Sequence, residues 1–230
     1  MNREELIQEY RKIKSQYSSA DSFQELLNNG FAFQYDEDEA ECELLFLGMN
    51  PSSGHIQEEE IAIWDRAMTE SKDYFKPFFS IQDSLRKTYD KEVKWTHFDL
   101  FVFRKTKQSF IKNTLMRNEV SREFLFKQLE IIKSRLLKAK PKVIVASNAL
   151  IRTFLGMDKM KDKKTGLYVG VWLGGWIKFE FDKKIGTYII TEPIELKGTI
   201  IFFTSMLSGQ RALDLGTRER LTWHIAQVLK

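Results

Sequence analysis

The stretch LLFLGMNPSSG, residues 44–54, decides the expected fold of this chain. Its apolar run is typical of a short strand that is buried on both faces of a sheet. The run ends abruptly in Gly48, Asn50, Pro51 and two serines. Asn-Pro and Ser-Gly are ordinary turn residues, so a plain turn would explain them. The other interpretation is a ligand site, because open α/β sheets bind ligands beyond the carboxyl ends of their strands.

Short apolar runs alternate with helical patterns along the rest of the chain. Two amphipathic helices are expected before Gly30, and residues 118–141 form the clearest helix, with Asn118 as its N-cap. Further helices are expected at 58–71, at 148–156 and near the C-terminus, and strands at 42–48, 95–103, 142–147 and 199–203. This alternation predicts an α/β three-layer sandwich whose central sheet is mostly parallel.

One segment departs from this pattern. Residues 165–191 predict an antiparallel hairpin inserted into the α/β scaffold, with its turn at 182–186. No internal repeat or long linker is visible, and 230 residues with 43% hydrophobic content are enough to bury one substantial core. We therefore expect a single domain over residues 1–230, with a helical segment over residues 1–40.

Composition limits the chemistry that the chain can support. Cys42 is the only cysteine, so neither an internal disulfide nor a cysteine metal cluster is expected, and the three histidines show no zinc-ligand spacing. The formal charge of +4 is compatible with a polyanionic partner. The first residues lack the pattern of a signal peptide, and no apolar run approaches the ~20 residues of a membrane helix. These features predict a cytoplasmic protein with no membrane partner.

Four features taken together resemble the uracil-DNA glycosylase superfamily. They are a strand ending in GMNP, a strand carrying Asp99 among apolar residues, the step KPKVIVASNAL, and a last strand that opens into TSMLSGQ. GMNP resembles the single-strand-selective monofunctional branch, and its Gly-x-Asn-Pro core also resembles the mismatch-specific branch. The resemblance covers about residues 42–230. It implies a uracil-DNA glycosylase-like fold, hydrolysis of an N-glycosidic bond in DNA, a role in base-excision repair, and no cofactor.

The resemblance gives roles to the first motif. Asn50 matches the residue that places the attacking water, and an amide oxygen can orient water although it is a weak base. The neighbouring residues are expected to contact the extruded base or, at Ser53, the DNA phosphates. The base-contacting set is Gly48, Met49, Pro51 and Ser52. The alternative for Ser52 and Ser53 is that they only complete a turn.

The second motif departs from the family pattern. The family has a His there that donates to the base oxygen where negative charge develops, whereas Thr204 or Ser205 occupies its place in this chain. Losing one preorganised donor typically costs ~3 kcal/mol, or ~100-fold in rate. In the family, the loop that follows inserts into the duplex, which implies DNA contacts from Met206, Leu207, Ser208, Gly209 and Arg211. The alternative is that Met206 and Leu207 belong to the core.

Asp99 is another departure, since family members that recognise uracil carry an Asn on this strand. An ionised Asp offers only acceptors, whereas an amide offers a donor and an acceptor. Ionised Asp99 is therefore expected to repel the 4-oxo group of uracil and to favour an amino group or a ring N–H. The alternative is a structural carboxylate held by the backbone or by a lysine.

Basic and aromatic residues complete the expected DNA surface. Residues 104–117 contain five basic residues and no acidic one, and Arg104 and Lys105 are the first candidates for phosphate contacts. A solvated helix face has a similar composition. One ring after the first motif is expected to stack on the extruded base. The candidates are Trp64, Tyr74, Phe75, Phe78 and Phe79.

Three functions remain open from the sequence. The leading hypothesis is a DNA glycosylase that acts on a damaged or deaminated base. The second is a protein of the same fold that binds nucleic acid without hydrolysing it. The third is an enzyme acting on a nucleoside or nucleotide, although the chain has no Gly-x-x-x-x-Gly-Lys phosphate loop. The first two require that residues 48–54, Asp99 and residues 204–211 face one cleft.

Overall fold

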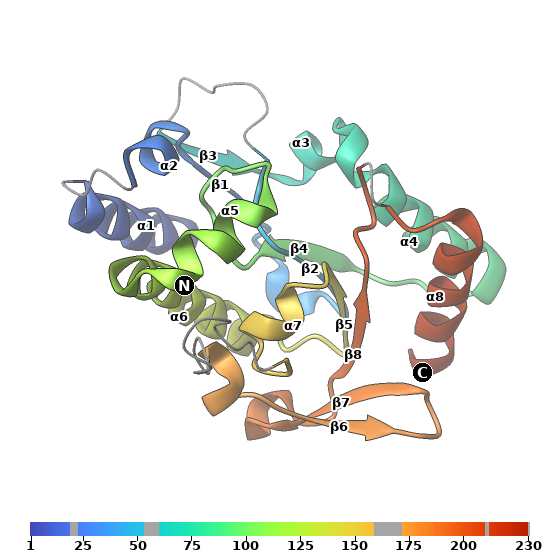
Figure 1. The fold of residues 1–230 in the computed structure, drawn as a ribbon. Helices are drawn as coiled ribbons and strands as arrows, with labels where there is room; N and C mark the ends of the chain where they lie inside the picture. The colour runs from blue at the N-terminus through green and yellow to red at the C-terminus, as the bar shows by residue number, and fades with distance from the viewer. Residues whose placement is uncertain (19–22, 53–59, 159–171, 210–211, 230) are drawn as a thin grey trace.

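The structure is a computed structural model that describes residues 1–18, 23–52, 60–158, 172–209 and 212–229. Its centre is a six-stranded sheet with the order β4-β2-β5-β8-β7-β6 (Figure 1). The first four strands of that order are parallel, and the last two are antiparallel. The strands are β2 (Leu44–Gly48), β4 (Trp95–Asp99), β5 (Val143–Ser147), β6 (Lys178–Asp182), β7 (Thr187–Glu192) and β8 (Ile200–Thr204).

Helices cover both faces of this sheet. They are α1 (Arg3–Tyr17), α2 (Gln24–Asn28), α3 (Arg66–Glu70), α4 (Lys76–Tyr89), α5 (Gln108–Asn113), α6 (Glu119–Ala139), α7 (Ile151–Phe154) and α8 (Leu215–Val228). Short 3-10 turns lie at Glu39–Glu41, Asp73–Phe75, Leu115–Arg117, Trp172–Gly175 and Ile194–Leu196. No helix in the described part of the chain combines the length and the apolar character needed to cross a bilayer.

Side chains of β2 alternate between two apolar clusters. Leu45 and Leu47 belong to the cluster that also contains the buried residues of α1 and α6, whereas Leu44 and Phe46 belong to the cluster shared with α4 and α8. Figure 1 shows these two pairs of helices on opposite sides of the sheet. Because every residue of β2 is buried, its sequence is apolar throughout. The predicted α/β architecture with a mostly parallel sheet is confirmed.

The longest helix also begins and ends as predicted. Asn118 caps α6, because its Oδ1 accepts a hydrogen bond from the Ser121 N–H at 3.2 Å. Lys140 then adopts a left-handed conformation with φ of 42°, and Pro141 follows it. The apolar positions Leu125 and Leu129 are fully buried. Capping and periodicity therefore locate this helix correctly.

The helix predicted for residues 58–71 is wrong over much of its length. Ile61–Trp64 is a strand, β3, which pairs in parallel with β1 (Phe31–Gln34) in a small second sheet. Helix α3 begins only at Arg66, where the Asp65 carboxylate accepts from the Met68 N–H at 2.8 Å. The run Ile-Ala-Ile-Trp is short, β-branched and aromatic, which favours a strand over a helix.

The predicted hairpin needs a similar correction. Residues 165–171 lie outside the described residues, Trp172–Gly175 forms a 3-10 turn, and the hairpin begins at Lys178. The antiparallel hairpin and its turn at 182–186 are confirmed, because β6 pairs with β7, and β7 also pairs with β8 and thereby extends the main sheet. Gly174 in the 3-10 turn lies close to Gly156, because a Cβ there would be 2.8 Å from the Cα of Gly156. The strand predicted for 95–103 likewise ends at Asp99 and continues as a buried connection.

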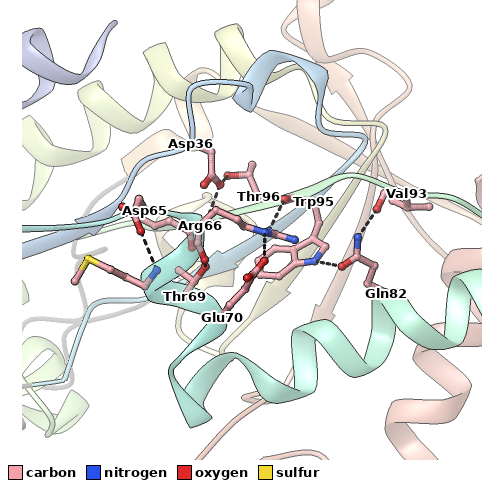
Figure 2. Close-up of polar contacts among 11 residues, drawn as sticks. Asp36, Asp65, Arg66, Thr69, Glu70, Gln82, Val93, Trp95 and Thr96 are labelled. Carbon is pink, nitrogen blue, oxygen red and sulfur yellow. Dashed lines mark hydrogen bonds and ion pairs between the residues drawn. The ribbon is translucent and has the colours of Figure 1, made fainter.

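A polar network fixes the start of β4 (Figure 2). Arg66 of α3 donates to the Trp95 carbonyl oxygen at 3.2 Å, and its guanidinium lies 4.1 Å from the centroid of the indole ring. Gln82 of α4 accepts from the indole Nε1–H of Trp95 and donates to the Val93 carbonyl oxygen, each at 3.0 Å. Helices α3 and α4 therefore hold the strand that ends at Asp99.

Substitution Gln82→Leu should lower the free energy of unfolding by about 1–3 kcal/mol, because it removes the partners of a buried indole N–H and of a backbone carbonyl. The measurement is urea unfolding followed by tryptophan fluorescence. The control is Thr88→Ala on the exposed part of the same helix, which should change stability by less than about 0.5 kcal/mol. Equal stability of the two variants would show that this network does not hold β4.

Candidate functional site

A cavity of about 840 Å³ lies at the carboxyl edge of the parallel strands. β2 is the first strand of the main sheet in the chain, and its two neighbours, β4 and β5, lie on opposite sides of it. Such a change in strand order opens a crevice between the strand ends, which is where ligands bind in open α/β sheets. The order of the strands in the sheet therefore determines where the cavity lies.

The structure brings most of the predicted site residues into this one cavity. The predicted residues that line it are Met49, Asn50, Pro51, Ser52, Asp99, Arg104, Lys105, Met206, Ser208 and Gly209. Gly48 lies directly behind the Asp99 carboxylate. Ser53 and Arg211 lie outside the described residues. The ends of β2, β4 and β8 therefore meet in space, although they are far apart in the chain.

Three predicted residues do not line the cavity. Thr204 ends β8 in register with Ser147, and Ser205 is exposed to solvent. Leu207 is only 2% exposed and packs in the apolar cluster that contains Leu221 of α8. Met206 lines the cavity, whereas its two neighbours do not. The replacement of the missing His by Thr204 or Ser205 therefore stays a prediction, whereas Leu207 belongs to the core, which is the alternative stated for it above.

The backbone fixes the orientation of the Asn50 amide. Its Nδ2 donates to the carbonyl oxygens of Pro51 at 2.8 Å, Lys105 at 2.7 Å and Phe103 at 3.4 Å. Three surrounding carbonyl groups require an amide nitrogen at this position, because an oxygen there would be repelled. Within the described residues no donor reaches the amide oxygen, which can therefore accept from a ligand or from water. This arrangement suits the water-orienting role expected of Asn50.

The Asn50 turn is itself attached to the segment after β4. The Pro51 carbonyl oxygen accepts from the Lys105 N–H at 3.0 Å, and the Met49 carbonyl oxygen accepts from the Phe101 N–H at 3.0 Å. These bonds continue the pairing of β2 with β4 beyond the strands. The position of Asn50 relative to Asp99 is therefore set by backbone hydrogen bonds.

Asp99 is held between Gly48 and His97. Its side chain is 7% exposed, and its Oδ1 lies 3.8 Å from Nε2 of His97. Burial raises the pKa of Asp99 to about 7 and lowers the pKa of His97 to about 3, so the imidazole is neutral at ordinary pH. Arg135 opposes burial at Asp99, since a nearby cation favours the carboxylate. The expected repulsion of uracil's 4-oxo group applies to the ionised form of Asp99, and burial disfavours that form.

Aromatic rings form one wall of the cavity. Trp64, Tyr74 and Phe75 line it, whereas Phe78 is fully buried against Phe46. Phe79 packs on Trp95, away from the cavity. Tyr74 is 40% exposed, which is the largest exposed fraction among the three lining rings. The stacking candidates are thus reduced to the three lining rings.

The basic residues belong to the cavity more than to an open surface. Arg104 is only 6% exposed and donates to the Asn29 carbonyl oxygen at 3.4 Å, and Lys105 forms an ion pair with Glu25. Arg104 and Lys105, the first candidates for phosphate contacts, therefore lie at the cavity and are largely buried there. Lys107 is exposed at the cavity, and Lys72 lies 3.9 Å above the Trp64 ring. Burial and the neighbouring Arg104 lower the pKa of Lys72.

Sequence reasoning missed several cavity residues. Ser147 and Asn148 follow the end of β5, and Asn148 Oδ1 accepts from the Leu150 N–H at 2.9 Å. The sequence contained a pattern that could have identified Ser147 and Asn148, because these polar residues end or follow a buried strand, as Asn50 follows β2. Lys72 and Gln108 also line the cavity and come from irregular segments or helix starts, which carry no comparable pattern.

A scan of protein-family models and a search of curated proteins found no match for this chain. The chemistry of the cavity is therefore inferred from its own residues. Among the described residues, no three His, Cys, Asp or Glu side chains are grouped so that they could hold a metal ion. The residues present support hydrogen bonding, stacking and charge neutralisation.

Substitution Gly48→Ala should be strongly destabilising, because the new Cβ would overlap Asp99 Oδ1 and lie 3.0 Å from His97 Nε2. We expect a loss of about 1–3 kcal/mol in the free energy of unfolding, measured with urea. The loss should shrink when Asp99→Ala is introduced as well, since that change removes the overlapping atom. Additive effects in this double-mutant cycle would contradict the close packing of the two residues.

Proposed function

We propose that this chain is a divergent member of the uracil-DNA glycosylase superfamily that hydrolyses the N-glycosidic bond of a damaged or deaminated base in DNA. The observation that carries the proposal is the fixed amide of Asn50, whose oxygen is left for water in the cavity that Asp99 also lines. The resemblance of GMNP and of the later strand ends supports the same assignment. The cavity volume of about 840 Å³ can hold an extruded purine or pyrimidine nucleotide.

The proposed reaction relies on positioning. Glycosidic cleavage passes through an oxocarbenium-like transition state, so the enzyme has to extrude the nucleotide, hold a water against the anomeric carbon and stabilise the departing base. The Asn50 oxygen would orient that water, and Asp99 would hydrogen-bond the base edge. Aromatic rings would pack on the base, while Lys72, Lys107 and their neighbours would offset the charge of the phosphates. Such a site produces slow hydrolysis.

A second candidate is binding of nucleic acid without hydrolysis. It is favoured by a specific observation, namely that neither Thr204 nor Ser205 lines the cavity. The described part of the second motif therefore offers no hydroxyl from these two residues to the base anion. The loss of such a donor would slow hydrolysis by ~100-fold.

Substitution Asn50→Ala should lower single-turnover cleavage by ~100-fold, because it removes the oxygen that orients water. The assay uses single-stranded oligonucleotides that contain one uracil, hypoxanthine or xanthine. Asn113→Ala on the exposed part of α5 is the matched control and should cleave at the wild-type rate. Circular dichroism checks that Asn50→Ala is folded.

Two results of this assay would redirect the proposal. Unchanged cleavage by Asn50→Ala would assign the water to another group. A wild-type protein that binds these oligonucleotides but cleaves none of them would favour the binding candidate.

The affinity for single-stranded DNA should fall steeply with salt, because cations at the cavity release counterions from the phosphates. Substitution Lys107→Gln should reduce the slope of log affinity against log salt by about 0.7, the value for one contact to a single strand. Lys12→Gln, on the exposed surface of α1, is the control and should leave the slope unchanged. The measurement is fluorescence anisotropy over a salt series. Undetectable binding at low salt would contradict both nucleic-acid functions and favour an enzyme of small nucleosides.

A further inference from the structure

The Asp99 carboxyl group has a fixed position in the cavity. Gly48 leaves the space of a missing side chain for Oδ1, and His97 Nε2 lies 3.8 Å away on the other side. Neither ring nitrogen of His97 has a hydrogen-bond partner within the described residues. Because the carboxyl is almost fully buried yet lines the cavity, the atoms that remain accessible face the cavity, where a ligand can pair with them.

The groups around Asp99 leave its charge poorly compensated. Arg135 of α6 lies over the Phe98 ring at 4.1 Å, but its guanidinium is engaged in an ion pair with Glu39. Tyr10 of α1 and Tyr74 are neutral phenols, because burial raises the pKa of each, with a smaller contribution from Asp99. Lys72 and Arg104 line the same cavity. Burial is therefore the main influence on the pKa of Asp99 and raises it, whereas Arg135 lowers it.

The two protonation states of a carboxyl group match different base edges. A neutral carboxyl has one O–H donor beside one acceptor, which complements a ring N–H beside a carbonyl, as in uracil and hypoxanthine. An ionised carboxylate has two acceptors, which complement a ring N–H beside an amino group, as in guanine and its oxidised derivatives. The neutral carboxyl therefore forms a repulsive or unpaired contact with a guanine-type edge, and the carboxylate does so with a uracil-type edge.

We propose that the protonation state of Asp99 selects the class of base bound in this cavity, with the neutral acid accepting uracil-type edges and the carboxylate accepting guanine-type edges. The inference rests on the proposed function, since it assumes that a base enters the cavity. The pKa of about 7 supports it, because the two states then exchange within the neutral range. The neutral form predominates below this value and the carboxylate above it. His97, with a pKa of about 3, stays neutral throughout.

The test measures binding separately from cleavage. Three single-stranded oligonucleotides differ only in one central base, uracil, hypoxanthine or guanine, on a 2′-fluoroarabino sugar that resists glycosidic hydrolysis. Affinities are measured between about pH 5.5 and about pH 8, below the range in which these bases ionise. For the wild type, the preference for uracil over guanine should fall by ~10-fold or more as the pH rises through 7, because one unpaired buried contact replaces a paired one.

Asp99→Asn is the decisive variant, since its amide keeps the donor and acceptor at every pH. It should retain the low-pH preference of the wild type across the whole range. Asp90→Asn is the matched control: this exposed aspartate, at φ of 52° after α4, lies in a backbone conformation that Asn tolerates well. Its pH dependence should equal that of the wild type.

A second readout needs no ligand. Between about pH 4 and about pH 7 the Asp99 carboxyl keeps its proton in the folded protein, whereas the unfolded chain has released it. The contribution of Asp99 to the free energy of unfolding of the wild type is therefore lost as the pH rises through this window. The urea midpoint of Asp99→Asn should therefore exceed that of the wild type by an amount that grows across this window and is constant above it. The opposite contribution of His97 is common to both proteins and cancels in the difference.

The outcomes separate the inference from the function on which it rests. A wild-type preference that does not change with pH, in a protein that binds all three oligonucleotides, would overturn the inference and leave the proposed function standing. The inference is overturned in the same way if Asp99→Asn shows the wild-type pH dependence. If no oligonucleotide binds at any pH, the proposed function fails and the inference fails with it.

Discussion

The pairing of β2 with β4 is the interaction on which the rest of the site depends. Its register sets Gly48 opposite Asp99, so the residue without a side chain lies where the carboxylate needs space. The same pairing continues through backbone hydrogen bonds to Met49 and Pro51 and delivers the carbonyl groups that hold the Asn50 amide. A shift of one residue would turn each of these side chains to the other face of the sheet. Fold and site are therefore fixed by one strand pair.

The elements with strong sequence patterns could be predicted. The strands β2 and β5 and the helix α6 have continuous burial or a clear cap, so burial and capping decide their structure. The clustering of strand ends followed from parallel topology alone, which is why Asn50 and Asp99 could be placed together in advance. The prediction of secondary structure failed in a short local segment. Ile61–Trp64 is too short for periodicity to separate a strand from a helix.

The remaining errors concern burial and side-chain direction, which no single-sequence pattern encodes. Arg104 and Leu207 were expected at the DNA surface, yet both are buried, because packing against α2 and α8 decides their exposure. The charge state of Asp99 could not be predicted either. It depends on burial and on Arg135, which belongs to a different element far along the chain. The chemistry of the site therefore depends on tertiary structure more than its location does.

The choice of Asp at position 99 argues for a role of the charge itself. A buried carboxyl without a firm cationic partner reduces stability whenever it ionises, and His97 beside it has no protein partner for either nitrogen within the described residues. Asn would supply the same donor and acceptor in the same volume without that penalty. Strongly perturbed groups in a cavity are characteristic of functional sites. Asn would serve a purely structural role, or a fixed specificity for uracil, with less loss of stability. A carboxyl at this position is therefore best explained by a ligand that uses both protonation states of Asp99.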